Sequence, residues 1–164
     1  MDLATFNQLP PGDAAAAIAH CVAIPAWQQA LAAARPYASP DALLAEGDRL
    51  ACLWQSDDLQ QALSAHPRIG EPANGVSKEA SLSRGEQSAM QQAGKALQQA
   101  ILQGNRDYEA RFQRVFLIRA KGRSGEEMLA ELQRRLNNDE HTEQQEALSQ
   151  LREITLLRLK ESIA

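Results

Sequence analysis

The sequence is poor in the residues that build metal, nucleotide or disulfide sites. It has only two cysteines, Cys21 and Cys52, which form no CxxC motif and lie in apolar helical contexts. We therefore expect both thiols to be reduced and buried. The three histidines, His20, His66 and His141, make no HExxH motif, and the chain has neither a glycine-rich phosphate loop nor a GxSxG elbow. We expect no cofactor and no metal.

Long apolar runs and a basic surface are also missing. No stretch approaches the roughly 18 apolar residues of a membrane-spanning helix, and the first residues lack the basic-then-apolar pattern of a signal peptide. The formal net charge is -4, which argues against nucleic acid as the main partner because phosphate binding needs a basic face. One or two local arginines would still suffice for a small anion. We therefore expect a cytoplasmic protein with no membrane or nucleic-acid partner.

Helical signals dominate what is present. With 44% hydrophobic and 23% charged residues, the 164-residue chain is typical of one globular domain, residues 1–164. No alternating run is long enough for a sheet, although Phe116–Ile118 could be extended. Unequal helix lengths favour an all-α bundle of about seven to eight helices in orthogonal packing. Apolar spacing and capping residues predict helices over 14–22, 26–34, 40–54, 57–65 (capped by Ser56), 83–113 (either continuous or broken near 104), 125–136 and 139–162.

One charged residue extends an apolar helix face near the C-terminus. Ala147, Leu151, Ile154 and Arg158 follow a 4-3-4 spacing. Arginine is rarely buried unless it is paired, and its planar fork suits a carboxylate or a carbonyl. The alternative is that Arg158 lies at the edge of the stripe, extends its charge to solvent and favours the helix C-terminus.

Glu86 and His66 also have two readings each. Glu86 heads an inward 4-3-4-4 stripe, yet Ser83 and Glu86 also form a capping box, and both roles can coexist. His66 ends a helix beside Pro67 and faces a loop rich in glycine and proline, which suits a fixed imidazole. The alternative is an ordinary exposed histidine at a helix end.

These residues belong to motifs that run through nearly the whole chain. In order, they are Phe6–Pro10, Arg35–Tyr37, His66–Gly70 (HPRIG), Ser83–Gln87 (SRGEQ), Tyr108, Phe112, Phe116–Gly122, Arg135–Asn138, Thr142-Glu143 and Leu157–Leu159. Together they resemble the OHCU decarboxylases, the 2-oxo-4-hydroxy-4-carboxy-5-ureidoimidazoline decarboxylases of urate degradation. HPRIG followed by SRGEQ is the most specific part of the resemblance.

The resemblance implies an all-helical fold, a cofactor-free decarboxylation that yields (S)-allantoin, a small anionic substrate and a homodimer as one option for assembly. It implies that His66 and Glu86 are the catalytic pair. It also implies substrate contacts from Pro67, Ser83, Arg84, Gly85, Glu86, Gln87, Phe116, Leu117, Ile118, Arg119, Ala120 and Arg158. Arg119 departs from the smaller or apolar residues usual there, which leaves its side-chain role open but not a backbone contact.

This chemistry suits the residues. Loss of CO2 leaves an electron pair on carbon, and the substrate's own carbonyl and C=N unit can delocalise it without an external electron sink. His66 has a suitable ordinary pKa to protonate the carbon, while Glu86 can hold the substrate hydroxyl and orient the imidazole. Two alternatives remain: a non-catalytic helical interaction module, and a decarboxylase of a related ureido or imidazole carboxylate.

Overall fold

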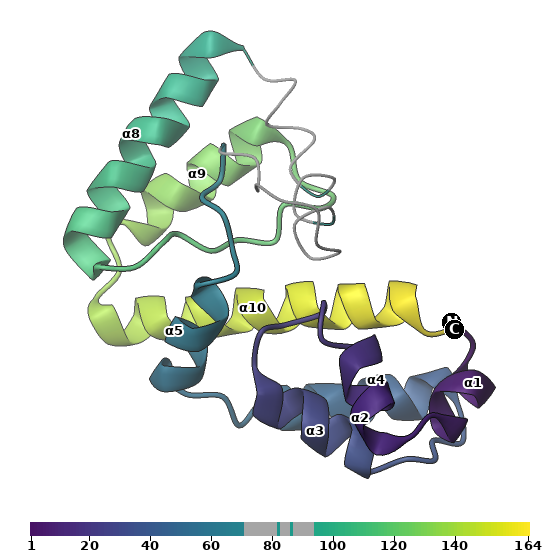
Figure 1. Cartoon of the computed structure of the whole chain (residues 1–164). Coiled ribbons are helices and arrows are strands. Elements are labelled where there is room, and N and C mark those ends of the chain that lie inside the picture. Colours follow the sequence, from purple (N-terminus) through teal and green to yellow (C-terminus); the bar gives the residue numbers. More distant parts are fainter. Residues whose placement is uncertain (71–81, 83–85, 87–93) are drawn as a thin grey trace. The chain divides into compact units, whose positions relative to one another are not determined.

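The computed structural model describes residues 1–70, 82, 86 and 94–164, and the regular structure in these ranges is entirely α-helical (Figure 1). This confirms the predicted all-helical fold class. The helices are α1 (Leu3–Gln8), α2 (Pro11–Ala17), α3 (Pro25–Ala33), α4 (Pro40–Ala51), α5 (Ser56–Leu63), α8 (Lys95–Phe112), α9 (Gly125–Arg135) and α10 (Glu140–Ser162).

Local side-chain chemistry sets most helix starts. Ser39 and Ser124 cap α4 and α9, because their hydroxyls accept hydrogen bonds from the N–H groups of Ala42 and Glu127, both at 3.1 Å. Both caps were predicted. Proline stands at the first position of α2, α3 and α4, where its missing N–H costs nothing.

The sequence prediction is partly wrong for the first helices of the chain. The six-residue helix α1 was not predicted at all, because it is too short to show an apolar repeat. Helix α2 begins at Pro11 and ends at Ala17, earlier at both ends than the predicted 14–22. Helix α5 begins at Ser56 itself, and the Asp58 carboxylate accepts the Gln55 N–H at 2.8 Å.

Helix α8 runs through Gly104 without a break, but it begins only at Lys95, because the backbone of Gly94 is extended. The predicted helix over 83–113 is therefore wrong at Gly94, and the break considered near 104 is absent. A Cβ atom at Gly104 would lie 2.5 Å from Cδ2 of Leu132 on α9. The glycine therefore permits close packing of α8 against α9 rather than a bend. The helix ends at Gln113, whose φ of 58° is left-handed.

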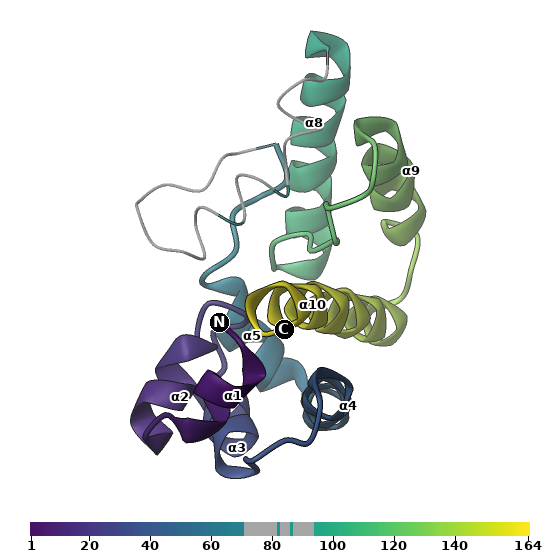
Figure 2. The ribbon, with the colours of Figure 1, turned by 90° about the vertical axis from the view of Figure 1, so that its right-hand side faces the viewer.

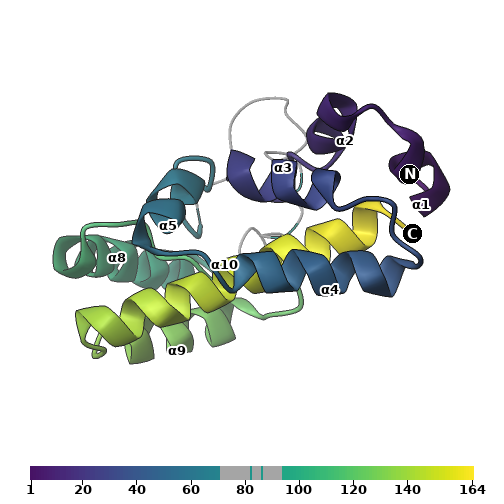
Figure 3. The same ribbon diagram turned by 90° about the horizontal axis from the view of Figure 1, so that it is seen from below.

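The described chain divides into two compact units, Met1–Ala62 with Arg152–Ala164, and Leu63–Leu151. The single domain expected over 1–164 stays a prediction. In the first unit, α4 lies beside the last part of α10 (Figure 3), and a Cβ at Gly47 would be 3.1 Å from Leu159. Trp27 donates to the Gly47 carbonyl at 3.0 Å, and its ring centroid is 6.3 Å from that of Trp54.

The unit Leu63–Leu151 is built on α8, α9 and the first part of α10, and α8 rises steeply across α10 rather than along it (Figure 2). Tyr108 is central: its ring lies 4.7 Å from that of Phe112 and 5.1 Å from that of Phe116. The buried cluster around it comprises Ile69, Ile101, Tyr108, Phe112, Phe116, Ile118, Ala120, Met128 and Leu132.

Both cysteines are free thiols, but only Cys21 is buried as expected. Cys52 is exposed and is the C-cap residue that follows α4, directly after the buried Ala51. Over the described ranges no helix is both long and apolar enough to cross a bilayer.

Candidate functional site

The HPRIG segment follows directly from α5. The N–H of His66 donates to the Leu63 carbonyl at 3.1 Å, which places the imidazole at the end of the last helical turn. His66 and Pro67 are half-buried. The predicted position of His66 at a helix end is therefore confirmed, whereas the fully exposed alternative is wrong.

Two side chains of α8 fasten this segment. Arg68 forms an ion pair with Glu109, with Nε and Oε1 2.8 Å apart. One turn earlier, the Asn105 amide donates to the Ile69 carbonyl at 2.7 Å. Ile69 itself is only 5% exposed and packs into the core cluster. The backbone after His66 is thus attached to α8 at two successive residues, Arg68 and Ile69.

A cavity of about 340 Å³ opens beside Ile69 and Gly70. The described residues that line it also include Lys95, Gln98, Gln99 and Leu102 from the first turns of α8. None of them was predicted to bind substrate. Among the residues that the structure describes, no three His, Cys, Asp or Glu side chains are grouped closely enough to hold a metal ion.

The segment Phe116–Ala120 connects α8 to α9 without regular secondary structure. Four of its residues are at most 7% exposed, and Arg119 is half-buried. The Leu117 carbonyl accepts from Nη1 of Arg135 at 2.7 Å. The Arg119 N–H donates to Oε1 of Gln150 at 2.9 Å. The Arg119 carbonyl accepts from Nε of Arg123 at 2.9 Å.

These hydrogen bonds fall on alternate residues, 117 and 119. In an extended chain the backbone polar groups of successive residues point to opposite sides, so those of residues 117 and 119 share one side and those of 118 and 120 share the other. Accordingly, the N–H groups of Ile118 and Ala120 make no hydrogen bond within residues 1–70, 82, 86 and 94–164. Buried N–H groups are rarely left without a partner. These two N–H groups are therefore suited to bind a group that the described residues do not supply, such as an oxygen of the substrate.

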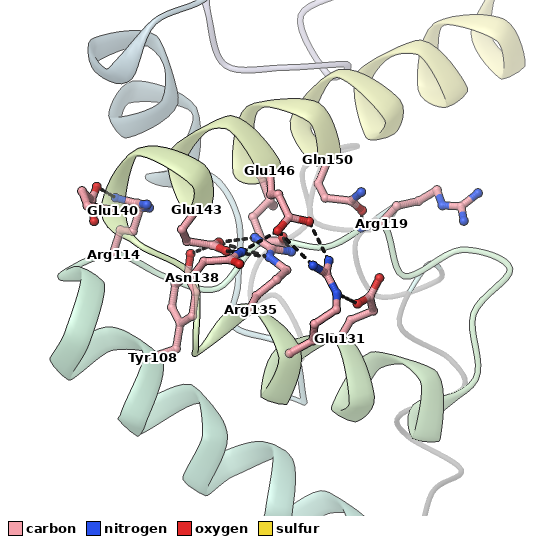
Figure 4. A network of polar contacts seen from close by, with 12 residues as sticks. Tyr108, Arg114, Arg119, Glu131, Arg135, Asn138, Glu140, Glu143, Glu146 and Gln150 are labelled. Carbon is pink, nitrogen blue, oxygen red and sulfur yellow. Dashed lines mark hydrogen bonds and ion pairs between the residues drawn. The ribbon is translucent and has the colours of Figure 1, made fainter.

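Behind this segment lies a buried polar network (Figure 4). Nε and Nη2 of Arg135 donate to the Glu143 carboxylate at 3.0 and 2.5 Å. The Tyr108 hydroxyl donates to the same carboxylate. Burial, followed by the hydrogen bond to Glu143, raises the pKa of Tyr108. The Arg135 guanidinium also lies 4.4 Å from the ring centre of Phe116.

Arg158 lies in the other unit, and its side chain is buried. It is 1% exposed, and Nη1 donates to the His20 carbonyl at 3.4 Å. The apolar stripe of α10 that precedes it is likewise buried, with Leu151 fully inaccessible. The inward reading of Arg158 is confirmed, and the alternative of a charge extended to solvent is wrong.

Glu86 is helical and half-buried. The later members of its predicted stripe, Leu97 and Ile101, are partly and fully buried, as expected. They lie on α8, which begins after the extended Gly94, so the prediction that one helix face continues from Glu86 to Ile101 is wrong. Four predicted substrate residues and two stripe residues lie outside the described residues: Ser83, Arg84, Gly85, Gln87, Met90 and Ala93. The capping box at Ser83 therefore stays a prediction.

Comparison with protein families gives one decisive match: the model of the OHCU decarboxylase family matches residues 7–160. The chain belongs to the OHCU decarboxylase family. It is therefore a carboxy-lyase that acts on OHCU, a small anionic substrate. Curated proteins give no match at a significant level.

Solved structures agree with this assignment. A crystal structure of OHCU decarboxylase in the presence of (S)-allantoin matches with a TM-score of 0.73 and 25% identity, over 87% of this chain and 94% of that one. A crystal structure of (S)-allantoin synthase matches with a TM-score of 0.74, over 99% of this chain and 54% of that one. At 17% identity, the second likeness shows the fold alone.

The sequence prediction for this OHCU decarboxylase did not give Arg135, Glu143 or Tyr108 a role. The signal was present, because Met128, Leu132 and Arg135 follow a 4-3 spacing on α9. Glu143 likewise stands four residues before Ala147, at the head of the stripe that identified Arg158. Charged residues on an otherwise apolar face of two neighbouring helices are the pattern that predicts a buried pair.

Proposed function

We propose that this OHCU decarboxylase releases CO2 from its substrate to give (S)-allantoin, with His66 and Glu86 as the catalytic pair. Substrate contacts come from Pro67, residues 83–87, the Phe116–Ala120 segment and Arg158. No cofactor takes part in this proposal, because the substrate ring accepts the electrons of the broken bond.

The main support is a shared core. Ile69, three residues after His66, packs in the same buried cluster as Phe116, Ile118 and Ala120. The HPRIG segment is fastened to α8 by Arg68 and Asn105, and the Phe116–Ala120 segment by Arg135 and Gln150. Two irregular segments that are fixed by side chains and packed on one core are typical of an active site. They favour this reading over a non-catalytic helical interaction module.

The reaction begins with cleavage of the bond between the ring carbon and the carboxylate. CO2 leaves, and the bonding electron pair delocalises into the adjacent carbonyl and C=N unit. Negative charge then develops on ring oxygen and nitrogen atoms. The N–H groups of Ile118 and Ala120 are suited to meet this charge, because fixed donors need no reorganisation during the reaction. The planar fork of Arg158 suits an oxygen of the substrate.

The reaction ends with protonation of the ring carbon on one face, which sets the (S) configuration. His66 supplies this proton. Glu86 accepts a hydrogen bond from the substrate hydroxyl and orients the imidazole, since a nearby carboxylate favours the charged form of histidine. General acid catalysis of this kind is typically worth on the order of 10² to 10⁴ in rate.

The test is an enzymatic assay on freshly generated substrate. OHCU is unstable, so it is produced from urate in the cuvette, and circular dichroism follows the (S) product with and without the purified protein. We expect the protein to accelerate the appearance of the (S) signal. A rate equal to the spontaneous one refutes the proposal. Acceleration only with another ureido or imidazole carboxylate would assign the chain to that substrate instead.

We also propose that the protein works in the cytoplasm as a homodimer. An exposed free thiol at Cys52 suits a reducing compartment, whereas the dimer rests on the family resemblance. Sedimentation equilibrium of the purified chain tests the dimer, and a monomer at micromolar concentration contradicts it. Cell fractionation tests the compartment.

A further inference from the structure

We propose that Arg135 is a positioning residue of this enzyme, which acts together with Glu143 and Tyr108. Arg135 fixes the Leu117 carbonyl, and thereby turns the N–H groups of Ile118 and Ala120 toward the substrate. This inference rests on the proposed function, because it assigns a role to side chains behind the substrate-lining segment.

Each of the three nitrogens of the Arg135 guanidinium donates a hydrogen bond. Two of its nitrogens contact the Glu143 carboxylate, and the third donates to the Leu117 carbonyl. Its guanidinium carbon lies over the Phe116 ring, 4.4 Å from the ring centroid. Arg135 therefore contacts the segment at both Phe116 and Leu117. A lysine has no plane and cannot make these contacts together.

Glu143 in turn is held from several sides. Besides Arg135, it accepts hydrogen bonds from the Tyr108 hydroxyl and from Nδ2 of Asn138, the latter at 3.2 Å. Its side chain is 0% exposed, and that of Arg135 is 2% exposed. Helices α8, α9 and α10 thus each contribute one member of the network. The position of the Leu117 carbonyl therefore depends on side chains from all three helices.

Stability alone does not account for this network. A buried ion pair loses so much hydration that apolar side chains of similar volume often stabilise a fold equally well. Arginine, however, can present a donor to a carbonyl while it remains paired, and an apolar side chain cannot. The feature that distinguishes this network from an apolar core is therefore the hydrogen bond to Leu117.

A second anchor acts two residues further on. Gln150 of α10 accepts the Arg119 N–H at 2.9 Å. Because Leu117 and Arg119 are held on the same side, the intervening Ile118 must present its N–H on the opposite side. Arg135 and Gln150 together fix the register of the segment, and a shift of one residue would reverse which N–H groups face the substrate.

The experiment compares three changes at these anchors. Arg135→Lys keeps the charge but loses the fork. The triple change Tyr108→Phe, Arg135→Met, Glu143→Leu replaces the network by an apolar core of similar volume. Gln150→Leu removes the second anchor at a half-buried site. We expect each to lower kcat about tenfold or more with KM within about twofold, because misplacement of a positioned group by about 1 Å can cost 10²-fold in rate.

The matched control is Arg134→Lys. Arg134 is the neighbour of Arg135 on α9 and also pairs with α10, through Glu146 at 2.6 Å, but its side chain is 51% exposed. Within the part of the chain that the structure describes, its hydrogen bonds go to Glu131 and Glu146 and not to the segment Phe116–Ala120, so kcat should stay within about twofold of wild type. Melting curves and far-ultraviolet circular dichroism establish that each variant is folded at the assay temperature.

The outcomes separate this inference from the proposed function. Inactive wild-type protein refutes the proposed function, whatever the variants do. Active wild type with unchanged kcat in a folded Arg135→Lys or triple variant overturns the positioning role. The same holds if lost activity returns on cooling, because the loss then follows stability. If the triple variant does not fold, Arg135→Lys and Gln150→Leu decide the question.

Discussion

Arg135 and Glu143 form an ion pair that is almost closed to solvent, while the adjacent Arg134 forms an exposed pair with Glu146 between the same two helices. The two pairs differ mainly in burial, with side-chain exposures of 2% and 0% for the inner pair and 51% and 30% for the outer pair. The contact between α9 and α10 therefore allows the stability contribution of a buried ion pair to be compared with that of an exposed one.

Removal of the inner carboxylate should destabilise the protein strongly. Glu143→Ala leaves the Arg135 charge buried without its carboxylate, and loss of one partner of such a pair costs about 3–5 kcal/mol. Glu146→Ala should cost less than about 1 kcal/mol, because exposed pairs contribute little. Urea denaturation measures both free energies of unfolding. Equal losses in the two variants would contradict the assigned difference.

A methyl group at Gly104 should also destabilise the protein. Alanine usually stabilises a helix interior by up to about 1 kcal/mol relative to glycine. At Gly104 the new Cβ would lie 2.5 Å from Leu132, which is fully buried, so we expect a net loss of about 1–3 kcal/mol from overpacking. The control is Gly12→Ala in α2, where no atom lies within 4 Å and the change should be neutral or stabilising. Thermal melting compares the two variants.

At alkaline pH the protein should unfold before its buried tyrosines can ionise in the folded state, so they ionise as it unfolds. Burial raises the pKa of Tyr37 to about 12, and burial together with Glu143 raises that of Tyr108. A raised folded pKa adds stability that is fully present below the unfolded value of about 10 and is lost as the pH rises above it. Tyrosinate absorbance and helical ellipticity should therefore change together. Reversible ionisation of one tyrosine near pH 10 in folded protein would contradict this.

The two catalytic side chains should be essential for turnover and dispensable for folding. His66→Asn and Glu86→Gln should each lower kcat by at least about 10², since each removes a group that handles a proton or orients it. The control is His141→Asn on α10, where the side chain is exposed and activity should not change. The circular dichroism assay measures turnover. Wild-type kcat in a folded His66→Asn protein would remove His66 from the mechanism.

Arg158 should act mainly on binding. Arg158→Lys keeps the charge but loses the planar fork, so we expect KM to rise about tenfold with a smaller change in kcat. Arg152→Lys, earlier on α10, is the control, because Arg152 pairs with Asp48 at 3.4 Å near the surface. The control should keep wild-type KM and kcat. If Arg158→Lys also keeps them, Arg158 does not contact the substrate.

Local patterns predicted the elements that local interactions determine. Ser39 and Ser124 were identified as caps because a cap needs only a hydroxyl and the N–H three residues later. Helix α10 was placed within one residue of its observed start for a similar reason. The short helix α1 could not be predicted this way, since one and a half turns contain too few apolar residues to show a period.

The site was only partly predictable, for a different physical reason. His66, Glu86 and Arg158 stand out because each interrupts a pattern along the chain. The hydrogen bond from Asn105 to the Ile69 carbonyl joins residues 36 positions apart, and neither residue is unusual in its own segment. The same is true of Arg135 and the Leu117 carbonyl. Contacts of this kind depend on how helices pack, which a single sequence does not encode locally.

Both tryptophans of the chain, Trp27 and Trp54, belong to the unit Met1–Ala62 with Arg152–Ala164, whereas Leu63–Leu151 holds only Tyr108 among the strong chromophores. Tryptophan fluorescence therefore reports the unfolding of one unit alone, while helical ellipticity reports the unfolding of both. Denaturation curves from the two signals coincide only if the halves of the molecule unfold as one cooperative system. The protein thus carries, without any label, an optical measure of its own cooperativity.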